Sequence, residues 1–156
     1  INQDRLQDLN NHLMLFFTGI SRFSSDIAES QVSNMKKCHL QMHELQDMVD
    51  EASSILGNLN TPLDEFGKLL NKAWENKRSL SDKVTNTQID ELYNAAIKAG
   101  ALGGKILGAG GGGFILFFAK PENQDRVKAA LADLTYVPFK FENTGSKVVL
   151  YQPDGF

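Results

Sequence analysis

The segment Gly103–Glu122 reads GGKILGAGGGGFILFFAKPE, and four consecutive glycines, Gly110 to Gly113, separate its two apolar stretches. Glycine loses more conformational freedom on folding than any other residue, so such a run lowers stability. A simple two-residue hairpin turn needs only one or two glycines. We therefore expect KIL and FILFFA to be short strands. The glycines between them would form a loop whose backbone approaches either another chain segment or a ligand.

Upstream of this segment, the apolar pattern predicts one strand and one long helix. Residues 13–18, LMLFFT, form a short aromatic run that is typical of a buried strand. From about Ser25 to Leu56, apolar residues recur at alternating spacings of three and four, which predicts a single helix. The expected buried face of that helix consists of Met35, Cys38, Met42, Leu45, Val49, Ala52 and Leu56.

Further elements follow from the same kind of evidence. A threonine-proline pair opens a second helix over residues 61–79, and a third helix is expected over 87–100. After the glycines, a helix over 122–134 precedes a strand at 136–142 and a last strand at 147–151. Strands and helices in this order favour an α+β fold. We expect a ferredoxin-like antiparallel sheet packed against helices, with a helical insertion.

The composition excludes several classes of function. The chain has 156 residues, with 16 basic and 19 acidic side chains and a net charge of −3, so it lacks the basic footprint of a nucleic-acid-binding protein. Its apolar runs are too short to span a bilayer, so no membrane partner is expected. Cys38 is the only cysteine, which fits a reducing, cytoplasmic location.

The glycine loop also formally contains G-x-G-x-x-G, at Gly108, Gly110 and Gly113. A dinucleotide-binding fingerprint requires a helix directly after the loop, whereas a strand-like segment follows here. A Walker loop is excluded because no G-K-[ST] closes the run. Successive N–H groups of a glycine loop can nevertheless form a nest that binds a phosphate. The alternative to a phosphate site is a structural one, in which the glycines let the chain turn a corner that packs closely against another backbone segment.

The stretch GGKILGAGGGGFILFFA resembles the third, C-terminal motif of the GHMP kinase superfamily, K-[IL]-[TL]-G-A-G-G-G-G followed by a hydrophobic strand. The match covers Lys105 to Phe114. The segments FFTGISR and AWENKRSLSDKVTNTQIDELYNAAIKAGALGGK are similar to the heptose 7-phosphate kinase branch of that superfamily. The resemblance therefore extends over nearly the whole chain.

This resemblance implies that residues 1–156 form the C-terminal domain of a GHMP kinase. The N-terminal ATP-binding domain would carry the phosphate loop P-x-x-x-G-L-G-S-S, the catalytic aspartate and the metal ligands. No such stretch is present in this chain, so no catalytic residue is expected in it and the chain alone should be inactive. The intact enzyme would use ATP and Mg²⁺, with this chain and the N-terminal kinase domain as partners.

The resemblance further implies that the intact protein phosphorylates a sugar phosphate, D-glycero-D-manno-heptose 7-phosphate, at C1. Other GHMP substrates, namely fucose, galactose or mevalonate, are the alternatives within the superfamily. A non-catalytic ferredoxin-like module that binds a small ligand is the alternative of a different class. Such a module would not need four consecutive glycines. The face left by a missing domain could also support a homodimer.

Two groups of residues are candidates for the site. The active-site loop consists of Gly108, Ala109, Gly110, Gly111, Gly112 and Gly113, together with Lys105. Lys105 would either neutralise phosphate or simply be the exposed neighbour of Ile106 on a strand. Arg22, Lys77 and Arg78 are the candidates for substrate binding, because cations can hold a phosphate. For Lys77 and Arg78 the plainer explanation is a stem that covers core surface while its charged head stays solvated, and for Arg22 it is a solvated loop arginine.

A metal site is not expected in the chain itself. His39 and His43 are four residues apart, a spacing that two metal ligands on one helix can have. No third ligand lies near them in the sequence, and the HExxH motif is absent.

Overall fold

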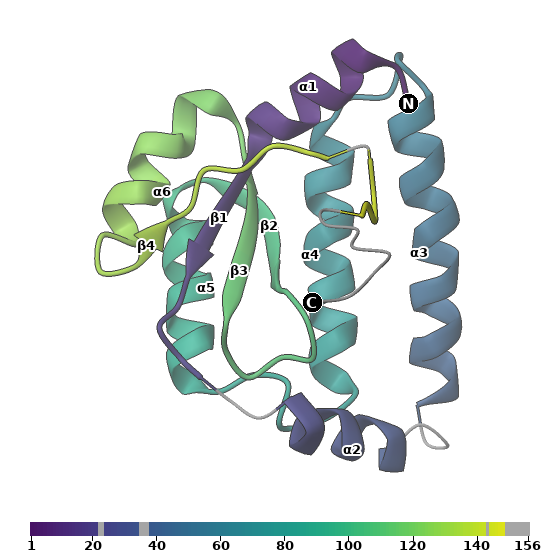
Figure 1. Cartoon of the computed structure of the whole chain (residues 1–156), viewed down its shortest axis with the longest axis vertical. Helices are drawn as coiled ribbons and strands as arrows, with labels where there is room; N and C mark the ends of the chain where they lie inside the picture. The colour runs from purple at the N-terminus through teal and green to yellow at the C-terminus, as the bar shows by residue number, and fades with distance from the viewer. Residues whose placement is uncertain (22–23, 35–37, 143, 149–156) are drawn as a thin grey trace, which may run out of the picture.

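The structure is a computed structural model that describes residues 1–21, 24–34, 38–142 and 144–148. The chain combines helices with one small sheet in an α+β fold (Figure 1). In chain order they are α1 (Gln3–His12), β1 (Leu13–Phe17), α2 (Ser24–Asn34), α3 (His39–Gly57), α4 (Asp64–Ser79), α5 (Thr87–Ala99), β2 (Ala101–Ile106), β3 (Phe114–Ala119), the 3₁₀ turn η2 (Pro121–Asn123), α6 (Gln124–Ala130) and β4 (Thr135–Tyr136).

The four strands form one antiparallel sheet in the order β2-β3-β1-β4. This arrangement confirms the predicted ferredoxin-like sheet, with α2 to α5 inserted between the first two strands of the chain. One face of the sheet is fully buried under α5, α6 and the Trp74 side chain of α4. The strand residues that this face contributes to the core are Met14, Phe16, Ile106, Ile115 and Phe117.

Helix α4 lies directly against β2, because glycines remove the side chains between the two backbones. A Cβ atom on Gly103 would collide with the carbonyl oxygen of Gly67 and lie 2.6 Å from the backbone nitrogen of Asn71. A Cβ on Gly67 would lie 2.6 Å from the ring of Phe118. The two glycines therefore fix how closely α4 approaches the sheet, and thus where its C-terminal turn lies.

The first helix, α1, was not predicted from the sequence. The side chain of Asn2 caps it by accepting a hydrogen bond from the Arg5 backbone N–H at 2.8 Å. Arg5 itself is buried, and its guanidinium donates to the carbonyl oxygens of Ile55 and Thr61, at 2.9 and 2.7 Å. The helix is mostly polar and ten residues long, so its apolar periodicity is too short to be recognised.

The prediction of one long helix from Ser25 to Leu56 was wrong. The segment forms two helices, and α2 lies crosswise beyond the ends of α3 and α4 (Figure 1). The expected face was also partly wrong, because Val49 is 56% exposed whereas Met48 and Ile55 are buried. The three-four spacing continues through the junction and therefore carries no sign of the change in direction. Met35 lies outside the described residues.

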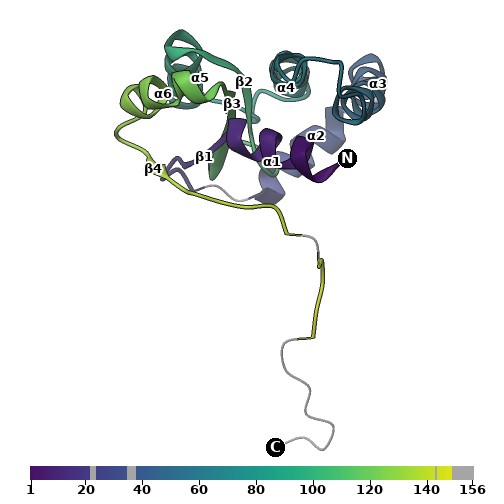
Figure 2. The ribbon, with the colours of Figure 1, turned by 90° about the horizontal axis from the view of Figure 1, so that it is seen from above.

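The predicted strand at 136–142 is also much shorter in the structure. The pairing of β4 with β1 ends soon after Tyr136, with a hydrogen bond from the Val137 N–H to the Leu15 carbonyl oxygen. Pro138 follows, and proline has no N–H to continue a ladder. Residues 144–148 lie away from the helices (Figure 2), and Lys147 and Val148 are not in a strand. Residues 149–151 of the last predicted strand are outside the described residues.

The contact of α4 with β2 predicts a large effect of a small substitution. Gly103→Ala should lower the free energy of unfolding by about 1–3 kcal/mol, because the new methyl group meets backbone atoms that cannot move aside. Urea denaturation followed by the fluorescence of Trp74, which is fully buried and the chain's only tryptophan, measures the change. Gly57→Ala is the control, since nothing lies within 4 Å of its added Cβ. Equal stability of the two variants would contradict the contact.

Candidate active-site loop

Residues 107–113 connect β2 to β3 in a conformation that depends on glycine. The φ angles of Gly108, Gly110, Gly111 and Gly113 are 72°, 126°, 73° and 83°. Residues with a side chain rarely adopt such positive values. The conformation of the loop therefore accounts for most of its glycines.

Backbone hydrogen bonds hold the loop on both sides. The N–H of Gly111 donates to the carbonyl oxygen of Val84 at 2.8 Å, and the N–H of Gly113 donates to that of Ile20 at 2.9 Å. The carbonyl oxygen of Gly113 in turn accepts from both the N–H and the hydroxyl of Thr18, each at 2.8 Å. The loop is thus attached to the segment after β1 and to the segment before α5.

Close packing also accounts for the glycines that lie against these segments. A Cβ on Gly110 would be 2.7 Å from the carbonyl oxygen of Val84, and a Cβ on Gly112 would collide with that of Ile20. One of the two explanations considered for the glycine run, close backbone packing, is therefore observed. The other explanation, approach to a phosphate, depends on the backbone N–H groups of the loop that are not used in this packing.

Four N–H groups of the loop have no acceptor among the residues that the structure describes. They belong to Gly108, Ala109, Gly110 and Gly112. The loop also borders a cavity of about 300 Å³, whose other walls are Phe17, Ile20, Ser21 and Leu107. Unpaired backbone N–H groups beside a cavity can bind an anion without any charged side chain. The predicted phosphate nest remains a prediction that this arrangement permits.

Lys77, at the end of α4, also contacts the loop. Its ammonium group donates to the carbonyl oxygen of Gly108 at 2.5 Å and lies 3.5 Å from that of Ile106. Partial burial, and secondarily the positive charge of Lys105, lower the pKa of Lys77 to about 8. Two of the predicted site residues are therefore close enough to affect each other electrostatically.

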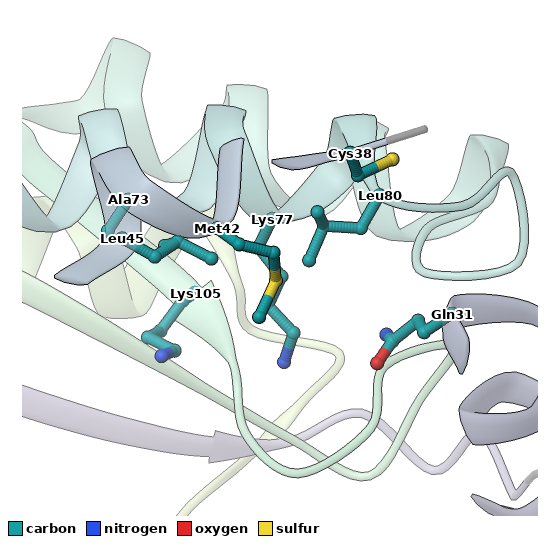
Figure 3. A pocket seen from close by; sticks show the side chains of 8 residues that line it. All are labelled: Gln31, Cys38, Met42, Leu45, Ala73, Lys77, Leu80 and Lys105. Carbon is teal, nitrogen blue, oxygen red and sulfur yellow. The ribbon is translucent and has the colours of Figure 1, made fainter. Parts of the chain in front are cut away.

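Lys77 and Lys105 line a pocket of about 270 Å³ together with Gln31 of α2. Figure 3 shows the three polar head groups along one side of this pocket, with the apolar side chains opposite them. The apolar lining consists of Cys38, Met42, Leu45, Ala73 and Leu80. In the described part of the chain, neither lysine forms an ion pair with a carboxylate.

Helix α2 also contacts the loop through Gln31, and this contact was not predicted from the sequence. The amide of Gln31 donates to the carbonyl oxygen of Ala109 at 2.9 Å. The hydroxyls of Ser30 and Ser81 are 2.7 Å apart, and Asn34 donates to the carbonyl oxygen of Leu80 at 3.2 Å. Polar residues on an amphipathic helix look the same whether they face solvent or a loop, so the sequence offers no signal for Gln31.

Of the two candidate arginines, the structure describes only Arg78. Arg78 forms an ion pair with Asp90 at 3.0 Å and lies over the ring of Trp74, 6.0 Å from its centroid. These contacts account for Arg78 structurally, and it is not part of the Lys77 pocket lining. Its role in substrate binding stays a prediction. Arg22 lies outside the described residues, so its predicted role stays a prediction as well.

Among the described residues, no group of three or more His, Cys, Asp and Glu side chains is positioned to hold a metal ion. Nor does any described helix combine the length and hydrophobicity needed to cross a membrane.

The environment of Lys77 predicts an unusual reactivity. Lysine with its ordinary pKa of about 10.4 is almost fully charged at pH 8, whereas Lys77 should be about half neutral and therefore nucleophilic. Acetic anhydride labelling, quantified by mass spectrometry from pH 6.5 to 11, should give a midpoint near 8 for Lys77. Removing the neighbouring charge by Lys105→Gln should raise that midpoint. A midpoint above 10 in the unsubstituted protein would refute this electrostatic account.

Comparisons with known proteins agree with this geometry. Residues 33–136 match the family profile described as "GHMP kinases C terminal". The D-glycero-alpha-D-manno-heptose 7-phosphate kinase of Campylobacter jejuni is 31% identical over 145 residues, which are 90% of this chain and 42% of that protein. The L-fucokinase/L-fucose-1-P guanylyltransferase of Bacteroides fragilis is 33% identical over 123 residues, 77% of this chain and 13% of that protein.

Among solved structures, the mevalonate kinase of Methanococcus jannaschii has the same fold, with a TM-score of 0.73 and 21% identity over 92% of this chain and 44% of that one. The chain spans less than half the length of the curated relatives named above. The family match covers most of the chain, and it includes the whole glycine loop and Lys77. The chain therefore belongs to the GHMP kinase family and carries the C-terminal part of these kinases.

Proposed function

We propose that the full-length protein is an ATP-dependent kinase that phosphorylates a sugar phosphate, D-glycero-D-manno-heptose 7-phosphate, at C1. The observation that carries this proposal is a glycine loop beside two lysines: among the described residues, four of the loop N–H groups have no acceptor and neither lysine has an acidic partner. The similarity to the heptose 7-phosphate kinase of Campylobacter jejuni supports the choice of sugar.

Phosphoryl transfer depends chiefly on positioning and on the stabilisation of charge. The loop suits both tasks, because its hydrogen bonds to Val84 and Ile20 fix the backbone before any ligand arrives. Its unpaired N–H groups then offer dipoles that need no reorganisation. In this proposal the loop forms one wall of the active site, and the described residues contribute no general base.

ATP and Mg²⁺ are the proposed cofactors of the full-length protein. The free N–H groups of the loop fit phosphate oxygens, whereas no described cluster of carboxylates fits a metal ion. When bound, Mg²⁺ would neutralise charge on the ATP phosphates. Its ligands, the catalytic aspartate and the ATP-binding phosphate loop would come from the proposed N-terminal kinase domain.

A partly exposed aromatic pair lies on the strands that flank the loop. Phe17 and Phe114 are about 40% exposed, and their ring centroids are 5.1 Å apart. Exposed apolar residues next to a candidate site often mark a contact surface. We assign this surface to the N-terminal kinase domain, with a homodimer as the alternative, and we place the protein in the cytoplasm.

The first test is ADP release by the full-length gene product with Mg-ATP and a panel of free and phosphorylated sugars. We expect turnover with heptose 7-phosphate and none with free heptose, fucose or galactose, because two cations without an ion-pair partner among the described residues favour an anionic substrate. Mevalonate should also fail, because its carboxylate carries one negative charge where a phosphate monoester carries about two. Turnover of fucose or mevalonate alone would leave a GHMP kinase but discard the heptose assignment. Absence of turnover with every compound would favour the non-catalytic binding module.

The second test concerns the loop itself. Gly112→Ala should lower kcat roughly 100-fold, because its methyl group displaces the loop from the Ile20 carbonyl and small misplacements at an active site are costly. Gly57→Ala, in an open position at the end of α3, is the matched control and should keep the full rate. Thermal denaturation of both variants separates a misplaced loop from an unfolded protein. Full activity of folded Gly112→Ala would exclude the loop from the active site.

A further inference from the structure

We propose that Lys77 and Lys105 form the subsite that holds the non-transferred phosphate of the sugar phosphate. This inference rests on the kinase function proposed above and specifies which end of the substrate each side of the loop would contact. Its basis is the arrangement of two cavities, two cations and one apolar wall around a single loop.

Two cavities that share no lining residue lie near the loop: loop residues line one, and the side chains that donate to the loop carbonyls line the other. The carbonyl oxygens of Gly108 and Ala109 accept hydrogen bonds from Lys77 and Gln31, which line the first cavity. The second cavity borders the loop residues whose N–H groups are free. A sugar phosphate brings its own phosphate at one end, and the phosphoryl group being transferred is at the hydroxyl of its other end. The two anionic groups could therefore occupy one cavity each.

The charges in the first cavity indicate an anion rather than a neutral ligand. Glu44 of α3 accepts a hydrogen bond from Asn76 and Glu75 of α4 accepts one from Asn71, and no carboxylate of the described residues forms an ion pair with either lysine. Lys77 and Lys105 thus repel each other without a counter-charge among the described residues. A phosphate monoester carries about two negative charges near neutral pH and can neutralise both ammonium groups.

The rest of the lining suits the carbon end of a phosphorylated sugar. Met42, Leu45 and Ala73 face the lysines across the pocket (Figure 3), so C–H groups beside the phosphate would meet apolar side chains. The volume of about 270 Å³ is enough for a phosphate and the carbon that bears it. A phosphate of ATP is the competing source of the same anion, and the experiment distinguishes the two.

The experiment compares Lys105→Gln, Lys105→Arg and the control Lys72→Gln in the full-length protein. The side chain of Lys105 makes no hydrogen bond or ion pair with any residue that the structure describes, so its replacement should leave the fold intact. Lys72 is an exposed residue of α4, the helix that also carries Lys77, and it does not line the pocket. We measure kcat and KM for heptose 7-phosphate and for ATP by ADP release.

Lys105→Gln should raise the KM for heptose 7-phosphate roughly 10- to 100-fold, with the KM for ATP unchanged and kcat within about twofold. Lys105→Arg should keep most of the affinity, and Lys72→Gln should behave as the unsubstituted protein. A rise in the KM for ATP instead would show that the pocket holds a nucleotide phosphate and would overturn the proposal. Unchanged constants in Lys105→Gln would overturn it too.

A second measurement does not depend on turnover. Inorganic phosphate should protect Lys77 from acetic anhydride, and Lys105→Gln should weaken that protection at least roughly fivefold. Turnover of heptose 7-phosphate without any protection would overturn the subsite while the kinase function stands. Protection without turnover of any sugar phosphate would mean that the proposed function has failed. The assignment of the bound phosphate to a sugar would then fail with it, and an anion site alone would remain.

Discussion

Helix α4 lies against β2 only because Gly103 has no side chain that could meet the Gly67 carbonyl oxygen. This contact sets the position of the C-terminal turn of α4, and Lys77 on that turn reaches the carbonyl oxygen of Gly108. The loop then depends on a second set of close approaches, to Val84 and Ile20. Backbone packing at glycines therefore places a charged side chain and a rigid loop beside each other.

The same packing explains why the loop combines structural and functional features. Two of its N–H groups attach it to Val84 and Ile20, and four others have no acceptor among the residues that the structure describes. Lys77 on its carbonyl side is costly for the folded chain alone, because burial and the positive charge of Lys105 lower the pKa of Lys77 and so disfavour its charged form. Such costs commonly occur where a protein has to bind an opposite charge. A sugar phosphate would remove this cost on binding.

Sequence reasoning predicted the parts of the fold that local signals specify. Regular apolar spacing and a proline near the start identified α4, and the two apolar stretches around the glycines identified β2 and β3. Sequence reasoning was wrong where contacts between distant segments determine the secondary structure. The spacing through Met35 and Cys38 does not reveal that one helix ends and another begins, and the short polar α1 is held chiefly by the buried contacts of Arg5. Lys77 and Lys105 were recognised as candidates, but their shared pocket with Gln31 requires the packing of α2.

The most direct test is a crystal structure of the full-length protein with heptose 7-phosphate and a non-hydrolysable ATP analogue. The account predicts the sugar phosphate group between Lys77 and Lys105, and the nucleotide phosphates against the free N–H groups on the opposite side of the glycine loop. A sugar phosphate bound away from both lysines, or a nucleotide in the lysine pocket, would contradict it.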